Sequence, residues 1–390
     1  MDRLQGAKFF TKLDIKDAYH NIRIREGDEW KTTFTTKLGT YEYQVMPFGL
    51  CNAPAAFQRW INRTLHQFVD ICCIVYLDDV LIYSKTKSEH IRDVRVILKA
   101  IEKSGKKIKP GKCEFHAAET EYLGFIIGRE GIKVDPIKTS AIWEWAKPTK
   151  VKEIQRFTGF CNFYQRFIKG FSRKARPLYQ LTRKDKKWEW GKKEDEAFDE
   201  IRTQLTSAPT LIHFDPKQPI TIETDASNYV TAGMLSPPGK DGMPHPVAYR
   251  SKPMTKAECN YDVHDKELLA IVKAREDWRR YVSKTEHRIT ILTDHQNLVP
   301  FMTTKKLVGR QIRWMEILSQ YYIKIEYQPG KEGGKPDTLT RREGDLPKNN
   351  DERIRQRERT LLPKEQYFEV IETVKTPIKR ERITTRSSDR

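Results

Sequence analysis

The sequence has few cysteines and lacks the cysteine patterns that build disulfide frameworks or zinc sites. Its six cysteines stand at positions 51, 72, 73, 113, 161 and 259. They include no CxxC pair and no Cys/His spacing suited to zinc. We therefore expect reduced thiols packed in an apolar interior, and neither a zinc finger nor a disulfide-rich secreted domain.

Long hydrophobic stretches are also missing. The longest apolar run, Ile71 to Leu77, is far shorter than the ~20 residues that a membrane-spanning helix needs. The first residues have none of the features of a secretory signal peptide. We therefore expect an intracellular protein.

Acidic residues are outnumbered by basic ones. The 390 residues contain 72 Lys plus Arg and 53 Asp plus Glu, which gives a formal net charge of +19. Such an excess attracts phosphate without sequence preference and predicts binding that weakens steeply with salt. A chromatin or RNA-binding protein would have the same balance, so charge alone does not identify an enzyme. The length allows two or three domains.

Two adjacent acids, Asp78 and Asp79, stand between the apolar runs 71–75 and 80–83. Runs of β-branched and aromatic residues around a short polar break predict a β-hairpin with the acids at its tip. Such pairs also occur in ordinary turns, because Asp tolerates turn geometry. A third acid, Asp14, lies in the strand-forming stretch 9–15, with no nearby cation to explain it. Three such carboxylates could hold two Mg²⁺ ions for phosphoryl transfer.

Four more acids stand in suggestive places in the second half of the chain. Asp225 ends an alternating strand pattern, Glu267 lies in a helical pattern, Asp294 follows the β-rich run 289–293, and Asp337 comes late. Taken singly, Asp225 or Asp337 would be a helix N-cap and Glu267 a solvent-facing residue. As a cluster they would repel one another unless a cation neutralised them.

Three segments closely resemble, in order and spacing, the reverse transcriptase of gypsy-class LTR retrotransposons. They are Leu13-Asp14-Ile15-Lys16-Asp17-Ala18-Tyr19, the run from Met46-Pro47-Phe48-Gly49 to Phe57-Gln58, and Tyr76-Leu77-Asp78-Asp79. The resemblance implies that Asp14, Asp78 and Asp79 form the metal-binding triad of a polymerase.

The same resemblance assigns several substrate contacts. Tyr19 would be the gate that excludes a ribonucleotide 2′-hydroxyl. Taken alone, Tyr19 fits an ordinary aromatic of the hydrophobic core equally well. Phe48 and Gly49 would shape the pocket for nucleotide and template, with a plain turn glycine as the alternative. The hairpin around Tyr122, Leu123 and Gly124 would grip the primer terminus.

The second half of the chain resembles the gypsy-class ribonuclease H. The matching segments are 261–272, 293–298, 313–314 and 327–331. The resemblance implies that Asp225, Glu267, Asp294 and Asp337 bind metal and direct hydrolysis of RNA in a hybrid. Two departures affect the last acid: the histidine that many ribonucleases H have on the preceding loop is missing, and Pro336 and Thr338 replace the usual alanines around Asp337.

Local patterns predict individual helices around the first set of acids. Pro54 suits the first turn of a helix, and Ser88 is a candidate cap for the next one. Ile91, Val94, Leu98 and Ile101 are expected to share the buried face of that second helix. Six lysines then follow: Lys99, Lys103, Lys106, Lys107, Lys109 and Lys112. They form either a solvent-exposed charged face or a surface that contacts phosphate groups.

The resemblance covers the chain from about its first ten residues to Arg342 and implies a multidomain α/β and α+β protein. We expect a reverse-transcriptase palm at 1–128, a thumb and connection at 129–215, a ribonuclease H-like domain at 216–342, and a charged tail at 343–390 leading toward an integrase. The family places a fingers subdomain before Asp14, and we expect it to be missing here.

The implied activities are RNA-directed DNA synthesis and ribonuclease H cleavage, each with two Mg²⁺ ions and with Mn²⁺ as a substitute. The implied partners are an RNA template, a DNA primer, an RNA/DNA hybrid and deoxynucleoside triphosphates, with no membrane. The resemblance also allows a homodimer, companion protease and integrase from the same polyprotein, and a location in cytoplasmic virus-like particles or the nucleus. The alternatives are ribonuclease H activity only, or a truncated or domesticated nucleic-acid-binding remnant without catalysis.

Overall fold

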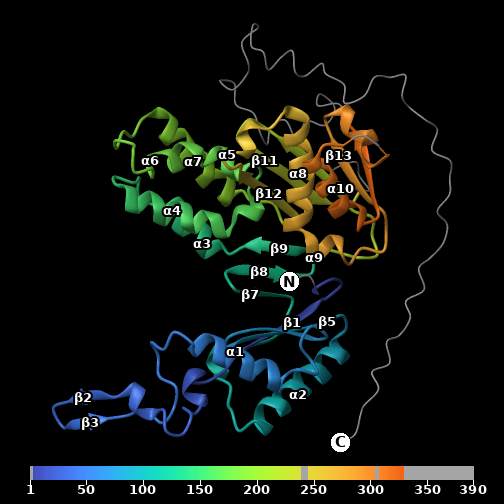
Figure 1. The fold of residues 1–390 in the computed structure, drawn as a ribbon. Helices are drawn as coiled ribbons and strands as arrows, with labels where there is room; N and C mark the ends of the chain where they lie inside the picture. Colours follow the sequence, from blue (N-terminus) through green and yellow to red (C-terminus); the bar gives the residue numbers. More distant parts are fainter. Residues whose placement is uncertain (1–2, 239–244, 304–306, 329–390) are drawn as a thin grey trace, which may run out of the picture.

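The computed structural model describes residues 3–238, 245–303 and 307–328, and Figure 1 shows their arrangement. A mixed α/β unit at the N-terminal end is followed by a small β-meander, a group of helices and a second α/β unit. The expected mixed α/β architecture is confirmed. Asp337 and the tail expected at 343–390 lie outside the described residues. None of the helices in the described part is both long and apolar enough to cross a membrane.

The first unit, which we call the palm, is built on an antiparallel sheet of strand order β4-β5-β1-β6. Its strands are β1 (Phe9–Asp14), β4 (Cys73–Tyr76), β5 (Asp79–Ser84) and β6 (Glu114–Ala117). Alternate residues of β5 point to opposite faces. Val80 and Ile82 join a core with the helices, whereas Leu81 and Tyr83 join a core with the β-meander. Both faces of the sheet are therefore covered, and the hairpin that carries the acids is firmly anchored.

Two helices cover one face of the palm sheet: α1 (Ala53–Thr64) and α2 (Lys87–Lys103). Pro54 stands in the first turn of α1, as predicted. The predicted cap of α2 was wrong. Thr86 caps it, because its extended backbone lets its hydroxyl accept a hydrogen bond from the amide of Glu89, whose carboxylate accepts one from the Thr86 amide.

The buried face of α2 also differs from the predicted one. Its buried residues are His90, Val94, Ile97 and Ile101, whereas Leu98 is half-buried. Ile91, expected in the core, is exposed. On this buried face, His90 hydrogen-bonds Thr11 of β1 and Ser84 of β5.

A separate hairpin of β2 (Phe34–Thr36) and β3 (Gly39–Tyr41) extends away from the palm (Figure 1). Beyond the palm, a three-stranded antiparallel meander consists of β7 (Glu119–Tyr122), β8 (Phe125–Gly128) and β9 (Gly131–Val134). Gly131 has a φ of 147°, and a Cβ there would collide with the backbone of Leu211. This close approach explains why only glycine fits where the meander meets the chain that leads into the second α/β unit.

The helical segment between the two α/β units has its own hydrophobic core, which includes Phe157, Phe167, Phe198 and Ile201. Its helices are α3 (Pro136–Trp143), α4 (Val151–Phe163), α5 (Phe171–Lys174), α6 (Arg176–Leu181) and α7 (Lys192–Thr206). The aromatic side chains between Phe157 and Phe167 are mostly buried or half-buried in this core. Phe163 is the exception, with 55% of its surface exposed.

The second α/β unit contains a five-stranded sheet of order β12-β11-β10-β13-β14. The strands are β10 (Thr221–Ala226), β11 (Val230–Ser236), β12 (Ala248–Pro253), β13 (Ile289–Thr293) and β14 (Ile323–Tyr327). Strands β10, β13 and β14 run parallel, and the other pairs are antiparallel. Parallel neighbours end at the same edge of a sheet, so the residues that follow β10 and β13 are brought together.

Three helices pack with this sheet or beside it: α8 (Val263–Asp277), α9 (Arg279–Val282) and α10 (Gly309–Ser319). Helix α8 lies against β10 and β11. Its Leu268, Ile271 and Val272 enter the same core as Ile222 and Ile291 of the sheet. This packing fixes the position of α8 relative to the ends of β10 and β13.

Candidate active sites

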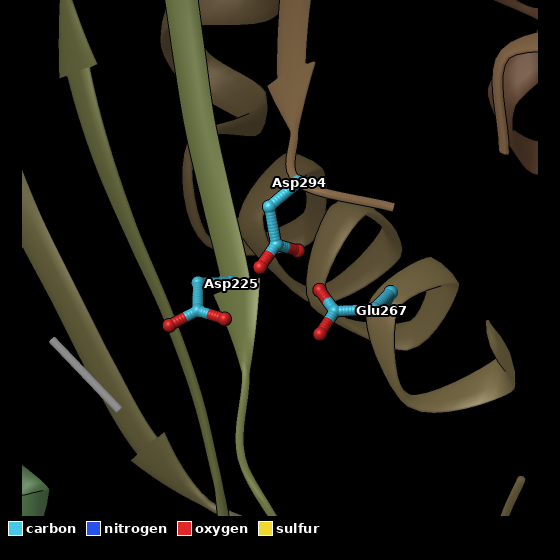
Figure 2. Close-up of side chains that lie close together, drawn as sticks. All are labelled: Asp225, Glu267 and Asp294. Carbon is cyan, nitrogen blue, oxygen red and sulfur yellow. The ribbon is translucent and has the colours of Figure 1, made fainter. Parts of the chain in front are cut away.

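Three acids from three separate elements meet at one end of the five-stranded sheet. Asp225 lies near the end of β10, Glu267 on α8, and Asp294 directly after β13. One carboxylate oxygen from each lies within 4.8 Å of the others, and Figure 2 shows the three side chains converging. We call Asp225, Glu267 and Asp294 the carboxylate trio.

The trio is largely removed from water. Asp225 is fully buried, Glu267 is 4% exposed, and Asp294 is half-buried. Grouping three negative charges away from water is unfavourable unless a cation or hydrogen bonds compensate them. Oε2 of Glu267 accepts a hydrogen bond of 3.1 Å from the amide of Ala226. Three converging carboxylates supply the oxygen ligands that a hard divalent cation such as Mg²⁺ prefers.

Sequence reasoning missed the network that fixes the start of α8. Asp265 is 2% exposed and accepts a hydrogen bond of 2.9 Å from Nε2 of Gln311. Nη2 of Arg310 lies 3.0 Å from Oδ2 of the same carboxylate. Both partners come from α10, so Asp265 ties α10 to the helix that carries Glu267.

The palm acids meet through strand pairing. Asp14 is the cross-strand partner of Asp79, and the amide of Ile15 donates a hydrogen bond of 3.1 Å to the carbonyl of Asp78. Leu77 and Asp78 form the two-residue turn between β4 and β5, with Leu77 at a φ of 52°. The predicted hairpin is thus confirmed, and Asp14 lies beside its tip.

Two lysines partner these acids. Nζ of Lys112 lies 3.7 Å from Oδ2 of Asp14, and Nζ of Lys12 lies 3.8 Å from Oδ1 of Asp79. The prediction that no cation accompanies Asp14 was therefore wrong. Lys112 is 98 positions away in the sequence and comes into contact only because β6 pairs with β1.

The electrostatic balance at Asp79 is unfavourable for its charged form. Burial is the main reason why the pKa of Asp79 is raised, and the charges of Asp78, Asp14 and Glu121 raise it further, whereas Lys12 opposes them. Glu121 was not among the predicted site residues. Within the described residues, the palm acids do not form a group as tight as the carboxylate trio.

The residues predicted to contact a nucleotide lie together. The ring of Tyr19 meets that of Phe48 edge-to-face at 5.2 Å and that of Phe57 at 6.0 Å. Phe48 is 73% exposed. Gly49 has a φ of 100° and open space where a Cβ would be. The positive φ of the turn, and not a close contact, therefore explains why glycine stands at this position. The contacts of Tyr19 and Phe48 with a nucleotide stay a prediction.

The predicted primer-contacting hairpin has a buried and an accessible part. Tyr122 is fully buried in the core between the palm sheet and the meander, so its side chain cannot contact a primer. Leu123 and Gly124 form the turn, with φ of 53° and 77°. The hydroxyl of Tyr164 donates a hydrogen bond of 3.2 Å to the carbonyl of Gly124. Any contact with a primer would therefore come from this turn.

The lysine-rich stretch runs beside the palm acids. The amide of Lys109 donates to the carbonyl of Asp14 at 2.9 Å, and the carbonyl of Lys107 accepts from the amide of Lys16 at 2.9 Å. Lys107, Lys109 and Lys112 are exposed. This positive surface adjoins the acids, as phosphate contacts would require.

Comparison with known families matches both α/β units. Residues 1–127 match the family described as reverse transcriptase (RNA-dependent DNA polymerase). Residues 215–321 match the RNase H-like domain found in reverse transcriptase. The first match and the start of the second lie within one residue of the predicted limits 1–128 and 216, whereas the second match ends at residue 321 and the predicted domain at 342. The domain boundaries themselves stay predictions.

Relatives and solved structures extend the likeness over most of the chain. The Tf2-3 and Tf2-4 transposon polyproteins of Schizosaccharomyces pombe are each 38% identical over 341 residues, which is 87% of this chain and 26% of their own length. A foamy viral protease-reverse transcriptase in complex with double-stranded DNA is similar with a TM-score of 0.71 and 24% identity, over 82% of this chain and 57% of that one. The same viral protein with an RNA/DNA hybrid gives a TM-score of 0.68 and 24% identity, over 84% and 45%.

Proposed function

Because this chain joins a reverse transcriptase domain to a ribonuclease H-like domain of the gypsy-class LTR retrotransposon family, we propose that it cleaves the RNA strand of RNA/DNA hybrids. The observation that carries this proposal is the convergence of the carboxylate trio from three elements. The chain spans about a quarter of the length of its polyprotein relatives, so the activity is proposed for this part alone.

The trio's own residues supply the binding and positioning in this reaction. Asp225, Glu267 and Asp294 would hold Mg²⁺ through their converging oxygens, and Asp337, which lies outside the described residues, is the fourth predicted ligand. When bound, paired divalent ions activate an attacking water and stabilise the leaving oxygen. The burial of Asp225 fixes its carboxylate, and Asp265 orients the helix that presents Glu267.

Strand-specific cleavage tests this function. With Mg²⁺ and a hybrid labelled on both strands, the chain should cut the RNA and leave the DNA intact. Asp225→Asn should abolish cutting while unfolding at the same denaturant concentration as the wild type. Asp93→Asn is the matched control, because Asp93 is a partly buried palm acid that bonds Ser84 far from the trio. Equal cutting by wild type and Asp225→Asn would refute the proposal.

A second candidate activity, RNA-directed DNA synthesis, is favoured by the pairing of Asp14 with Asp79 at the hairpin tip. The proposed substrates are an RNA template, a DNA primer and deoxynucleoside triphosphates. Asp14, Asp78 and Asp79 would hold Mg²⁺ after Lys112 and Lys12 move aside. Asp78→Asn should abolish primer extension and leave hybrid cutting unchanged, whereas extension by that variant would remove the polymerase assignment.

The polyprotein relatives suggest a wider setting. We propose a protease and an integrase from the same polyprotein as neighbours, self-association into a homodimer, and an intracellular location in virus-like particles or the nucleus. Sedimentation of the purified chain tests the homodimer: a monomer at all concentrations would argue against it.

A further inference from the structure

The helical segment is bonded to the sheet that carries the trio. The amide of Ser172 on α5 donates a hydrogen bond of 3.1 Å to Oγ of Ser251 on β12, and Oγ of Ser172 donates one of 2.5 Å to the Ser251 carbonyl. Both serines are buried. These contacts protect the edge strand β12 and hold α5 and the start of α6 against the sheet.

The strand register shows where along the sheet this contact lies. Asp225 pairs with Ala232, and Ala232 pairs with Ser251. Strands lie about 4.8 Å apart, so the backbone of Ser251 is roughly 10 Å from that of Asp225. The helical segment therefore meets the sheet at the level of the trio.

From this position, α6 places a cation on the loop that follows Asp225. The guanidinium of Arg176, the first residue of α6, lies over the ring of Tyr229 at 3.8 Å from its centroid. Tyr229 stands in the short loop between β10 and β11, four residues after Asp225. That loop is held closed by bonds between Ser227 and Val230. Arg176 is thus located at the same end of the sheet as the trio.

The stacking on Tyr229 leaves the charge of Arg176 without a carboxylate partner in the part of the chain that the structure describes. Among the ion pairs of the described residues none involves Arg176, in contrast to Lys174, which pairs with Glu200 at 2.6 Å. Arg176 is half-buried and Tyr229 is 39% exposed. An arginine stacked on an aromatic ring has a restricted orientation, and the edge of its planar guanidinium remains available for a phosphate.

We propose that Arg176, supplied by the helical segment and oriented by Tyr229, contacts a backbone phosphate of the nucleic acid that occupies the trio's site. This inference rests on the proposed hybrid cleavage and adds a positioning residue from outside the ribonuclease H-like domain. Arg176 would hold the duplex in register with the trio and take no part in the bond cleavage.

Salt-dependent binding and steady-state cutting by the full chain test this role. Arg176→Ala should raise KM for the hybrid about fivefold to tenfold with little change in kcat. In anisotropy titrations of the same hybrid without divalent metal, the slope of log K against log salt should fall by about 0.9, the value for one lost phosphate contact. Arg176→Lys should restore most of the slope, because it keeps the charge. Tyr229→Phe should behave as wild type, because it keeps the ring.

The matched control is Arg183→Ala, which removes an equal charge two residues beyond the end of α6. An unchanged salt slope in Arg176→Ala, or an equal change in Arg183→Ala, would overturn the proposal. A purely structural role would lower stability without altering the slope. The anisotropy titration does not depend on cutting, so failure of the wild type to cleave RNA would refute the proposed activity and leave the Arg176 contact separately testable.

Discussion

The backbone amide of Leu77 donates a hydrogen bond of 2.8 Å to the side-chain oxygen of Gln58. This bond joins α1 to the turn that carries Asp78, at a residue whose φ of 52° is unfavourable for leucine. Nε2 of Gln58 is bonded in turn to Asn62 at 2.9 Å. Gln58 therefore stabilises the strained turn that places the palm acids.

Removal of this bond should disturb the palm site. Gln58→Leu leaves the amide of Leu77 without its acceptor, and we expect a loss of about 1 kcal/mol in the free energy of unfolding together with loss of primer extension. Gln58→Glu keeps an acceptor and should retain more extension. Urea titration and a primer-extension assay measure the two effects. Asn62→Ala is the control, and an equal loss of extension there would contradict a specific role for the Leu77 bond.

Sugar selection should depend on the ring of Tyr19. Its edge-to-face contacts with Phe48 and Phe57 hold the ring in place, so Tyr19→Ala should open space beside the incoming sugar and admit ribonucleotides. Tyr19→Phe keeps the ring and should keep the selectivity. Competition between ribo- and deoxyribonucleoside triphosphates in primer extension measures this ratio. Unchanged selectivity in Tyr19→Ala would show that the ring is only structural.

The buried imidazole of His90 should make the palm less stable in acid. His90 bonds Thr11 on β1 at 2.8 Å and Ser84 on β5 at 3.0 Å, and burial lowers its pKa. The unfolded imidazole titrates near 6.5, so between the two pKa values the unfolded chain binds more protons. The contribution of His90 to the free energy of unfolding is fully present above about pH 6.5. It decreases as the pH falls toward the lower, folded-state pKa, by at most about 1.4 kcal/mol per pH unit.

Urea unfolding at several pH values measures this contribution as the difference between wild type and His90→Asn. The variant should be less stable at neutral pH and show a shallower decrease below pH ~6.5. His66→Asn, which replaces an exposed histidine of the same unit, is the matched control. Identical pH profiles for wild type and His90→Asn would contradict the assignment.

The sequence was most informative where the determinants of structure are local. The hairpin at Asp78 and Asp79 followed from strand-forming runs around a short break, and Pro54 correctly marked the first turn of α1. The choice between Thr86 and Ser88 as helix cap depended on the backbone angle at each position, which composition does not reveal.

Contacts between distant segments were not predictable in this way. Lys112 reaches Asp14 only through the pairing of β6 with β1, and Asp265 meets Arg310 only because α8 packs beside α10. The stacking of Arg176 on Tyr229 likewise depends on how the helical segment packs against β12. The resemblance to a known family supplied the acids themselves, because each acid taken alone has an ordinary structural explanation.

The central claim is that Asp225, Glu267 and Asp294 form a divalent metal site. Its most direct test is Mn²⁺ binding measured by electron paramagnetic resonance in an Asp78→Asn, Asp79→Asn background, which removes two of the three palm acids as competing ligands. We predict saturable Mn²⁺ binding that Asp225→Asn eliminates and that Mg²⁺ displaces. Mn²⁺ binding of the same affinity with and without the Asp225→Asn substitution would contradict the account.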